Sequence, residues 1–252
     1  MINPKSILIT GASSGIGRTL ALAYAGPDVF VAFSGRNQQR VDEVAEELRA
    51  LGAMVDARVL DVSDKQAMAD WIDEVDEQRP LELVVANAGV GISKDDGLSF
   101  AEITEQTFGV NVYGICHTVH PALEKMLPRQ RGQIAIVSSI AGFVGMPSYV
   151  AYSSSKNTVR AYGEGLRGLY KSRGIEVNVI CPGFVTTRMT EKNKYPMPFL
   201  MDAERAARIM KRGLERNKAR IGFPWPTYLF ARSLQIMPLA WCERITGAMP
   251  RK

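Results

Sequence analysis

Short apolar runs alternate with amphipathic stretches along most of the chain. The apolar runs have the length of buried strands, and the amphipathic stretches repeat their apolar positions with the period of an α-helix. Repeated strand–helix alternation predicts a parallel sheet with helices on both faces, which is a doubly wound α/β fold of three layers. The predicted strands are residues 6–10, 29–33, 54–60, 83–86, 133–138 and 175–181, with 219–223 as a candidate seventh.

The stretches between these strands predict the helices. One helix follows the glycine-rich turn at 10–17, and others span 40–51, 103–128, 152–173 and 203–217. Ser63 and Gln66 have the spacing of a capping box and predict the start of a further helix after the third strand. No repeat, low-complexity segment or Pro/Ser-rich linker interrupts the pattern, so we expect residues 1–252 to form a single domain.

Polar residues or glycines follow each predicted strand. In an open parallel sheet the carboxyl ends of the strands meet at one edge, where ligands bind. The residues in these positions are Gly11, Ser34 to Arg36, Asp61, Asn87 to Gly89, Ser138 with Ser139, and Pro182 with Gly183. The pattern therefore predicts a binding site at this edge of the sheet.

The segment TGASSGIG at residues 10–17 connects the first strand to the first helix. Gly11 allows a tight turn, and Gly15 and Gly17 allow a diphosphate to approach the backbone amides and the positive end of the helix. A turn that only connects two elements is the alternative. The strand before it and the helix after it are the context in which such a glycine motif indicates a dinucleotide site.

Ser139, Tyr152 and Lys156 carry the candidate chemistry. Tyr152 and Lys156 lie one helical turn apart, so both side chains project from one helix face. A phenol titrates near pH ~10 and is a poor acid or base at neutral pH, but a nearby ammonium can lower its pKa. Taken alone, such a Tyr–Lys pair is more often a solvated helix face than an active site.

Together these elements resemble the short-chain dehydrogenase/reductase family over about residues 5–190. The resemblance implies a Rossmann fold that transfers a hydride between NAD(P) and an alcohol/carbonyl pair. The matching motifs, in the order and at the spacings typical of the family, are TGASSGIG, Asn87-Ala88-Gly89, Ser139, Tyr152-x-x-x-Lys156 and Pro182-Gly183.

The resemblance also implies four catalytic residues. Tyr152 would be the acid/base, Lys156 would hold the nicotinamide ribose and favour the phenolate, and Ser139 would steady the substrate oxygen. Ser139 matches the family serine because it precedes Tyr152 by thirteen residues, which Ser138 does not. Asn111 would keep a proton-relay water near the lysine; without its context it would be an ordinary polar helix residue.

The resemblance places the cofactor along the edge described above. Its implied contacts are Gly11, Ser13, Ser14, Gly15, Ile16, Gly17, Arg36, Asp61, Val62, Asn87, Ala88, Gly89, Tyr152, Lys156, Pro182, Gly183, Val185 and Thr187. Within this set, Asp61 and Val62 would grip the adenine, and Thr187 would meet the nicotinamide carboxamide.

Arg36 bears on the choice of cofactor. An acidic residue at the end of the second strand would bind the adenine ribose hydroxyls and repel a 2′-phosphate. This chain has Ser34, Gly35 and Arg36 there, and a guanidinium suits a phosphate dianion. We therefore expect NADP(H) rather than NAD(H), with a surface charge at the start of the next helix as the other interpretation of Arg36.

Composition and charge exclude several classes of function. The hydrophobic share of 46% with 23% charged residues is ordinary for a globular protein, and no apolar run is long enough to span a membrane. The three cysteines have no metal or disulfide spacing, and His117 and His120 lack ligand partners in the sequence, so we expect no metal. No nucleic-acid motif accompanies the net charge of +5. The absence of a signal-peptide pattern favours a cytoplasmic protein.

The C-terminal extension, residues 224–252, departs from the common ending of the family. It is rich in aromatic, Leu, Met and Pro residues, and residues 201–252 hold eleven Lys/Arg against four Asp/Glu. Three interpretations compete: a cap over the substrate site, packing across a dimer partner, or peripheral membrane contact through 224–247. The prolines limit a continuous helix to about residues 227–237. We expect a homodimer through the helices at 111–127 and 152–171, because the missing ending removes the contact that the family's tetramer uses.

Residues 189–200 form the expected substrate loop. If the apolar side chains in and near this loop line a cleft, they predict a small hydrophobic carbonyl or alcohol substrate; ordinary packing is the alternative. They are Tyr195, Met197, Phe199, Phe143, Val144, Met146 and Phe184. The competing function is a non-catalytic, dinucleotide-binding regulator of the same fold, which would be expected to lose Ser139, Tyr152 or Lys156.

Overall fold

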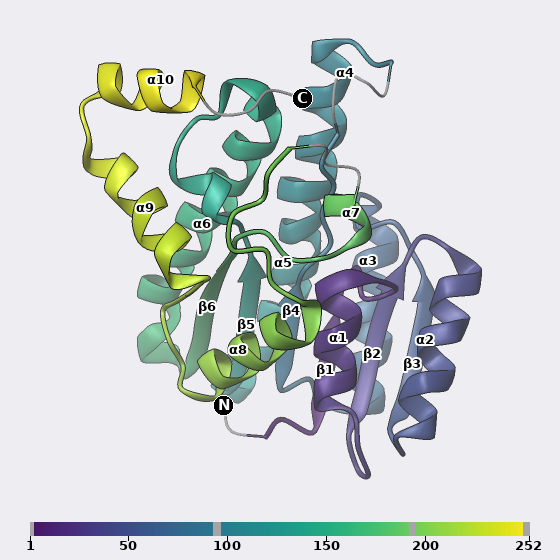
Figure 1. The fold of residues 1–252 in the computed structure, drawn as a ribbon. Helices are drawn as coiled ribbons and strands as arrows, with labels where there is room; N and C mark the ends of the chain where they lie inside the picture. Colours follow the sequence, from purple (N-terminus) through teal and green to yellow (C-terminus); the bar gives the residue numbers. More distant parts are fainter. Residues whose placement is uncertain (1–2, 93–96, 192–194, 249–252) are drawn as a thin grey trace.

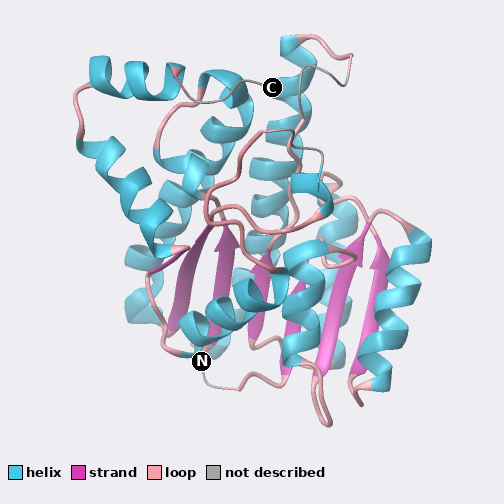
Figure 2. Ribbon diagram, viewed as in Figure 1, coloured by secondary structure: helices cyan, strands magenta, loops and turns pink. Residues whose placement is uncertain are grey.

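The computed structural model describes residues 3–92, 97–191 and 195–248. One parallel seven-stranded sheet lies at its centre, with strand order β3-β2-β1-β4-β5-β6-β7, and helices cover both of its faces (Figures 1 and 2). The doubly wound fold is therefore confirmed, including the seventh strand. The strands are β1 Ser6–Ile9, β2 Phe30–Gly35, β3 Met54–Val59, β4 Leu83–Ala86, β5 Gly132–Val137, β6 Ile175–Pro182 and β7 Arg220–Phe223.

Two helix layers enclose the sheet. The helices are α1 Gly15–Tyr24, α2 Gln38–Ala50, α3 Lys65–Gln78, α4 Phe100–Phe108, α5 Gly114–Arg129, α6 Val150–Tyr170, α7 Arg188–Glu191, α8 Ala203–Glu215, α9 Trp225–Ile236 and α10 Leu239–Gly247. Helices α1, α2 and α8 pack on one face of the sheet, and α3, α5 and α6 pack on the other. Successive strand residues point to opposite faces, so Ile7 and Ile9 join the first core while Leu8 joins the second.

Two predicted helix boundaries were wrong. Helix α3 is capped by Asp64, whose carboxylate accepts a hydrogen bond from the backbone N–H of Ala67, and not by Ser63. The Ser63 hydroxyl instead donates to Asp61 at 2.7 Å. The long helix expected at 103–128 is divided into α4 and α5 by a π-helical turn, Gly109–Tyr113. Such turns are uncommon and occur often at functional sites.

The C-terminal extension contains two helices. Helix α9 agrees closely with the expected range, but α10 was not predicted because Pro238, which ends one helix, also stands at the N-cap of the next. Helix α9 packs on the turn Ile140–Phe143, where the rings of Phe143 and Tyr228 meet edge to face at 5.6 Å. Among the described residues no helix combines the length and apolarity needed to cross a membrane.

Candidate active site

A cavity of about 820 Å³ opens at the carboxyl ends of the strands. It runs from the glycine turn to the Tyr152–Lys156 pair and onward to α9. All the cofactor-binding residues expected from the sequence line it, together with Ser139. Of the expected catalytic and cofactor-binding residues, Asn111 alone is outside the lining, because it lies fully buried behind the cavity wall.

The glycine turn is locked to the loop after β4. Thr10 accepts hydrogen bonds at its hydroxyl from the backbone N–H groups of Asn87 (3.1 Å) and Ala88 (3.2 Å). In return, the Asn87 amide donates to the carbonyls of Thr10 (2.9 Å) and Gly11 (3.2 Å). A Cβ at Gly11 would lie 2.7 Å from the Ala88 Cα, and one at Gly17 would lie 2.5 Å from the Asn87 Nδ2. Only glycine therefore permits this close approach of the two loops.

Arg36 and Asp61 face each other at the far end of the cavity. Their closest side-chain N–O separation is 3.8 Å, and both side chains are substantially exposed. Burial opposes ionisation of Asp61, but hydrogen bonds from Ser63 and the charge of Arg36 outweigh it and lower the pKa of this carboxyl. Asp61 is therefore an ionised hydrogen-bond acceptor at neutral pH, already engaged on one side by Ser63.

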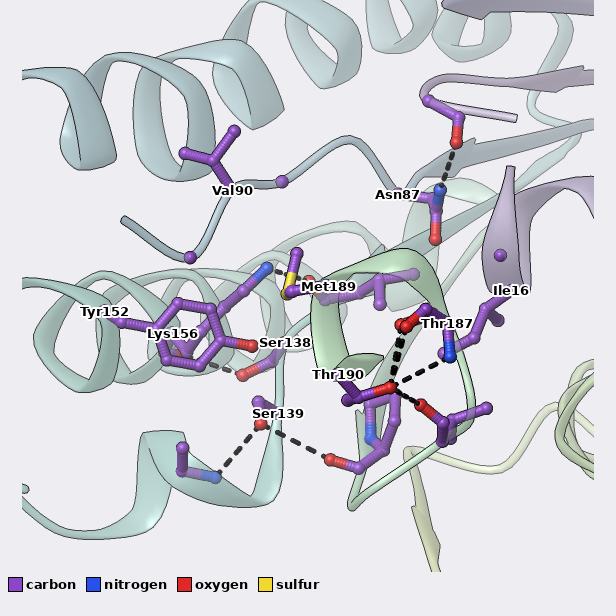
Figure 3. A pocket seen from close by; sticks show the side chains of 18 of the residues that line it. Ile16, Asn87, Val90, Ser138, Ser139, Tyr152, Lys156, Thr187, Met189 and Thr190 are labelled. Atoms are coloured by element: carbon purple, nitrogen blue, oxygen red, sulfur yellow. Dashed lines mark hydrogen bonds between the residues drawn. The ribbon is translucent and has the colours of Figure 1, made fainter. Parts of the chain in front are cut away.

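Ser139, Tyr152 and Lys156 project into the same part of the cavity (Figure 3). The Ser139 hydroxyl contacts the Pro182 carbonyl at 3.4 Å and accepts from the backbone N–H of residue 141. Ser138 has another task, since its hydroxyl donates to the Lys156 carbonyl at 2.6 Å and ties β5 to α6. This division of roles agrees with the choice of Ser139 as the site serine.

Lys156 is buried, and none of the carboxylates in the described residues forms an ion pair with it. Its ammonium donates to the Val137 carbonyl at 3.0 Å and lies 5.9 Å from the centre of the Tyr152 ring. Burial lowers the pKa of Lys156 to about 8. Burial also raises the pKa of Tyr152, and a hydrogen bond with Ser139 opposes this change only in part. The expected lowering of the tyrosine pKa by Lys156 is thus wrong for the protein alone, because desolvation of the phenol dominates.

Asn111 holds the loop after β4 against α6. Its Oδ1 accepts from the Val90 N–H at 2.8 Å, and its Nδ2 donates to the Val90 carbonyl and the Ser155 hydroxyl, both at 3.0 Å. Both amide hydrogens are therefore used. A Cβ on Gly89 would lie 3.1 Å from the Asn111 Oδ1 and 3.2 Å from the Lys156 Nζ, so this glycine keeps the two side chains adjacent. The proton-relay role of Asn111 stays a prediction.

The segment after β6 brings Thr187 back to the glycine turn. A Cβ at Gly15, whose φ is +56°, would lie 3.1 Å from the Thr187 Cγ2. Thr190, which sequence reasoning missed, fixes this segment: its hydroxyl donates to the Val185 carbonyl at 2.7 Å and accepts from the Thr187 N–H at 2.9 Å. Thr190 lies one helical turn beyond Thr187, and this spacing is the feature of the sequence that could have indicated a contact between the two residues.

Apolar side chains line the rest of the cavity. Tyr195, Val144, Met146 and Phe184 do so as expected, and Tyr149, Phe230 and Leu234 also contribute. The remaining expected residues, Phe143, Met197 and Phe199, do not line it. Phe143 is buried against Tyr228 and Phe199 is 61% exposed, because an aromatic residue type does not specify the direction of its side chain. The described residues contain no group of His, Cys, Asp or Glu able to hold a metal ion.

Comparisons with known proteins agree with this geometry. A family model described as short chain dehydrogenase matches residues 5–197. An uncharacterized oxidoreductase of Myxococcus xanthus is 37% identical over 235 residues, 93% of each chain. The 17-beta-hydroxysteroid dehydrogenase 13 of Rattus norvegicus is 32% identical over 252 residues, 98% of this chain and 82% of that protein. A solved short-chain dehydrogenase from Sphingobium yanoikuyae, in complex with NADPH, matches with a TM-score of 0.79 at 23% identity, covering 93% of this chain and 97% of that one. The chain therefore belongs to the short-chain dehydrogenase family and is an oxidoreductase of the CH–OH class.

Proposed function

We propose that this protein is an NADP(H)-dependent oxidoreductase that interconverts an uncharged, apolar carbonyl compound and the corresponding secondary alcohol. The observation that carries the proposal is the convergence of Ser139, Tyr152 and Lys156 on a cavity that also contains the glycine turn. The bound nicotinamide would supply or accept the hydride. The residues of the chain itself would hold the cofactor, orient the substrate oxygen and move the proton.

The residues at the cavity fit a dinucleotide. The close approach of Gly11 and Gly17 to the loop after β4 leaves a turn without side chains at the start of α1, and a diphosphate binds favourably at such a helix end. Asp61 and Val62 would contact the adenine, and Thr187 would meet the carboxamide. Arg36 supports NADP(H) over NAD(H), because a guanidinium pairs well with a phosphate dianion.

Tyr152 would donate its phenolic proton to the carbonyl oxygen during reduction and recover a proton from the alcohol in the reverse direction. The raised pKa of Tyr152 keeps the phenol protonated in the protein alone, which is the form that reduction requires. The Ser139 hydroxyl would donate a hydrogen bond to the same oxygen as negative charge develops on it. Lys156 would bind the ribose hydroxyls and stabilise the phenolate once the proton has left.

The lining beyond Ser139 supports an apolar substrate. Tyr149 and Tyr195 lie there, and their hydroxyls bond to each other at 3.2 Å. Helix α9 contributes Phe230 and Leu234 to the lining. Because α9 borders the cavity, we propose that this part of the C-terminal extension caps the substrate site. A long or polycyclic apolar group would bury the most surface in this space.

The variant Tyr152→Phe tests the acid/base role. It removes only the ionisable oxygen, so NADPH affinity should change by less than about threefold while turnover falls by on the order of 10³-fold. Turnover would be followed by NADPH absorbance with a panel of ketones and secondary alcohols. Undiminished turnover would falsify the assignment. Binding of NADPH without turnover of any panel member by the wild-type protein would favour the non-catalytic regulator.

Direct comparison of NADPH and NADH affinities tests the cofactor preference, and a preference for NADH would reject it.

The assembly of the protein and its location in the cell stay predictions. Sedimentation equilibrium should show a homodimer, which we expect to form through α5 and α6. Partition of the full chain with anionic vesicles distinguishes a cap from peripheral membrane contact through 224–247; we expect the protein to stay in the aqueous phase. A cytoplasmic location stays a prediction from the sequence.

A further inference from the structure

A second, smaller cavity lies at the edge of the sheet that β7 forms. It has a volume of about 260 Å³ and is lined by residues of α8, β7 and α9. Four of the lining residues are basic, and none of those that the structure describes is acidic. The basic residues are Arg212, Arg216, Lys218 and Arg220. This cavity shares no lining residue with the active-site cavity, although α9 borders both.

The positive charge around this cavity is not balanced by ion pairs. The Arg220 Nε lies 2.6 Å from the Glu164 Oε1, but the same carboxylate also pairs with Arg160 at 3.1 Å. The other three basic side chains of the lining form no hydrogen bond or ion pair with any residue that the structure describes. One carboxylate therefore serves two guanidinium groups, and the cavity keeps a surplus of positive charge.

The end of α8 does not explain these side chains. Basic residues are favoured near the last turn of a helix, because the carbonyls there lack partners and the helix dipole is negative. Here the backbone N–H groups of residues 216–218 already donate to the carbonyls of residues 212–214. The helix dipole is equivalent to about half a charge. The side chains of Arg212, Arg216 and Lys218 are therefore not needed as caps.

The loop between α8 and β7 is held in place by buried polar groups. Asn217 has a φ of +45°, and its Oδ1 accepts hydrogen bonds from Arg167 at 2.8 Å and from Asn178 at 3.0 Å. The Asn178 amide also donates to the Lys218 carbonyl at 2.8 Å. Arg216 and Lys218 flank Asn217, so the backbone that carries them is fixed. A fixed backbone lowers the entropic cost of binding a ligand.

We propose that this cavity binds a small molecule through its phosphate or diphosphate group, with Arg212, Arg216 and Lys218 as the donors. Like charges gathered around one cavity repel one another, and a multiply charged oxyanion relieves this repulsion. The same anion accepts charge-assisted hydrogen bonds, and each guanidinium can engage two of its oxygens at once. The inference goes beyond the proposed function, because none of these residues lines the active-site cavity.

Isothermal titration calorimetry with pyrophosphate tests the proposal. The full chain is first saturated with NADPH, so that the glycine turn is occupied. The wild type should then bind pyrophosphate with a Kd on the order of 10 µM. Acetate at the same concentrations should not bind measurably, because it carries a single charge. Equally tight binding of acetate would overturn the assignment to a phosphate group.

The double variant Arg216→Gln with Lys218→Gln should weaken pyrophosphate binding at least about 30-fold, because it removes two charged donors. Arg49→Gln is the matched control and should leave the affinity within about twofold. Arg49 is likewise an exposed arginine in the last turn of a helix, but it belongs to α2, which packs near the opposite edge of the sheet.

Unchanged urea unfolding shows that the double variant is folded, and a selective loss of pyrophosphate binding then supports the proposal. If the double variant is unfolded, Arg212→Gln decides, with an expected loss of at least about fivefold. The proposal is overturned if the folded variants bind as tightly as the wild type, or if Arg49→Gln weakens binding equally. It is also overturned if the wild type binds no pyrophosphate up to about 1 mM. Failure of the proposed function is a separate outcome, seen as absent NADPH binding, and leaves the comparison of variants valid.

Discussion

Replacement of Lys156 by methionine should stabilise the fold at neutral pH while abolishing turnover. The side chain is 4% exposed, and burial lowers its pKa from 10.5 to about 8. This difference corresponds to about 3 kcal/mol of unfavourable charge burial at pH 7. Methionine fills a similar volume without the charge, but it loses the hydrogen bond to the Val137 carbonyl, worth about 1 kcal/mol. The net expectation is a gain of about 2 kcal/mol in the free energy of unfolding.

The stability difference between Lys156→Met and the wild type should depend on pH in a definite direction. The folded-state pKa of Lys156 lies below its unfolded value, so the unfolded chain binds more protons between pH about 8 and about 10.4. The cost of burying the charge is therefore complete below pH about 8 and is relieved as the pH rises towards the unfolded pKa. The advantage of Lys156→Met over the wild type should shrink by about 2 kcal/mol between pH 7 and about 9.5.

Urea unfolding of both proteins at several pH values, followed by tryptophan fluorescence, measures this difference. Lys171→Met replaces an exposed lysine and serves as the matched control, with little expected change in stability. A difference between Lys156→Met and the wild type that does not vary from pH 7 to about 9.5 would refute the reasoning. So would a variant less stable than the wild type at pH 7, because the buried charge would then have a partner strong enough to offset desolvation.

Three further substitutions test separate parts of the structure. Asp76→Ala removes a carboxylate that accepts two hydrogen bonds from Arg129, so urea unfolding should show a loss of about 3 kcal/mol; a loss below about 1 kcal/mol would contradict the assigned pairing. Gly222→Ala places a methyl group within the Tyr228 ring, so α9 must shift and KM for apolar substrates should rise several-fold at constant NADPH affinity. Unchanged KM would argue against the cap. Gly17→Ala should weaken NADPH binding at least about tenfold by calorimetry, and binding equal to wild type would show that the turn adapts.

The strands and the glycine turn could be predicted because their signals are local. A buried strand needs only a short apolar run, and a glycine turn needs only its neighbours along the chain. The carboxyl ends of parallel strands lie at one edge of the sheet, so motifs that are distant in the sequence meet there, and all the expected cofactor residues line the cavity. Tyr152 and Lys156 followed from helical spacing.

Other features depend on contacts that spacing does not encode. The pKa of Tyr152 is raised where the sequence led us to expect a lowered value, because burial of the phenol outweighs the other influences and the sequence contains no measure of that burial. Helix α10 was missed because a proline either ends a helix or begins one, and the surrounding residues decide which.

The π-helical turn Gly109–Tyr113 has a consequence for insertions and deletions. Its defining hydrogen bond joins the Gly114 N–H to the Gly109 carbonyl, so the turn contains one residue more than an α-helical turn. Deleting one residue here would restore an unbroken α-helix from α4 into α5 and improve its backbone geometry. Asn111 lies within this turn, so the same deletion would remove the bulge that sets the direction of its side chain and carry its amide away from Val90 and Ser155. At this position a shortened chain would fold readily and lose the support beneath its active site.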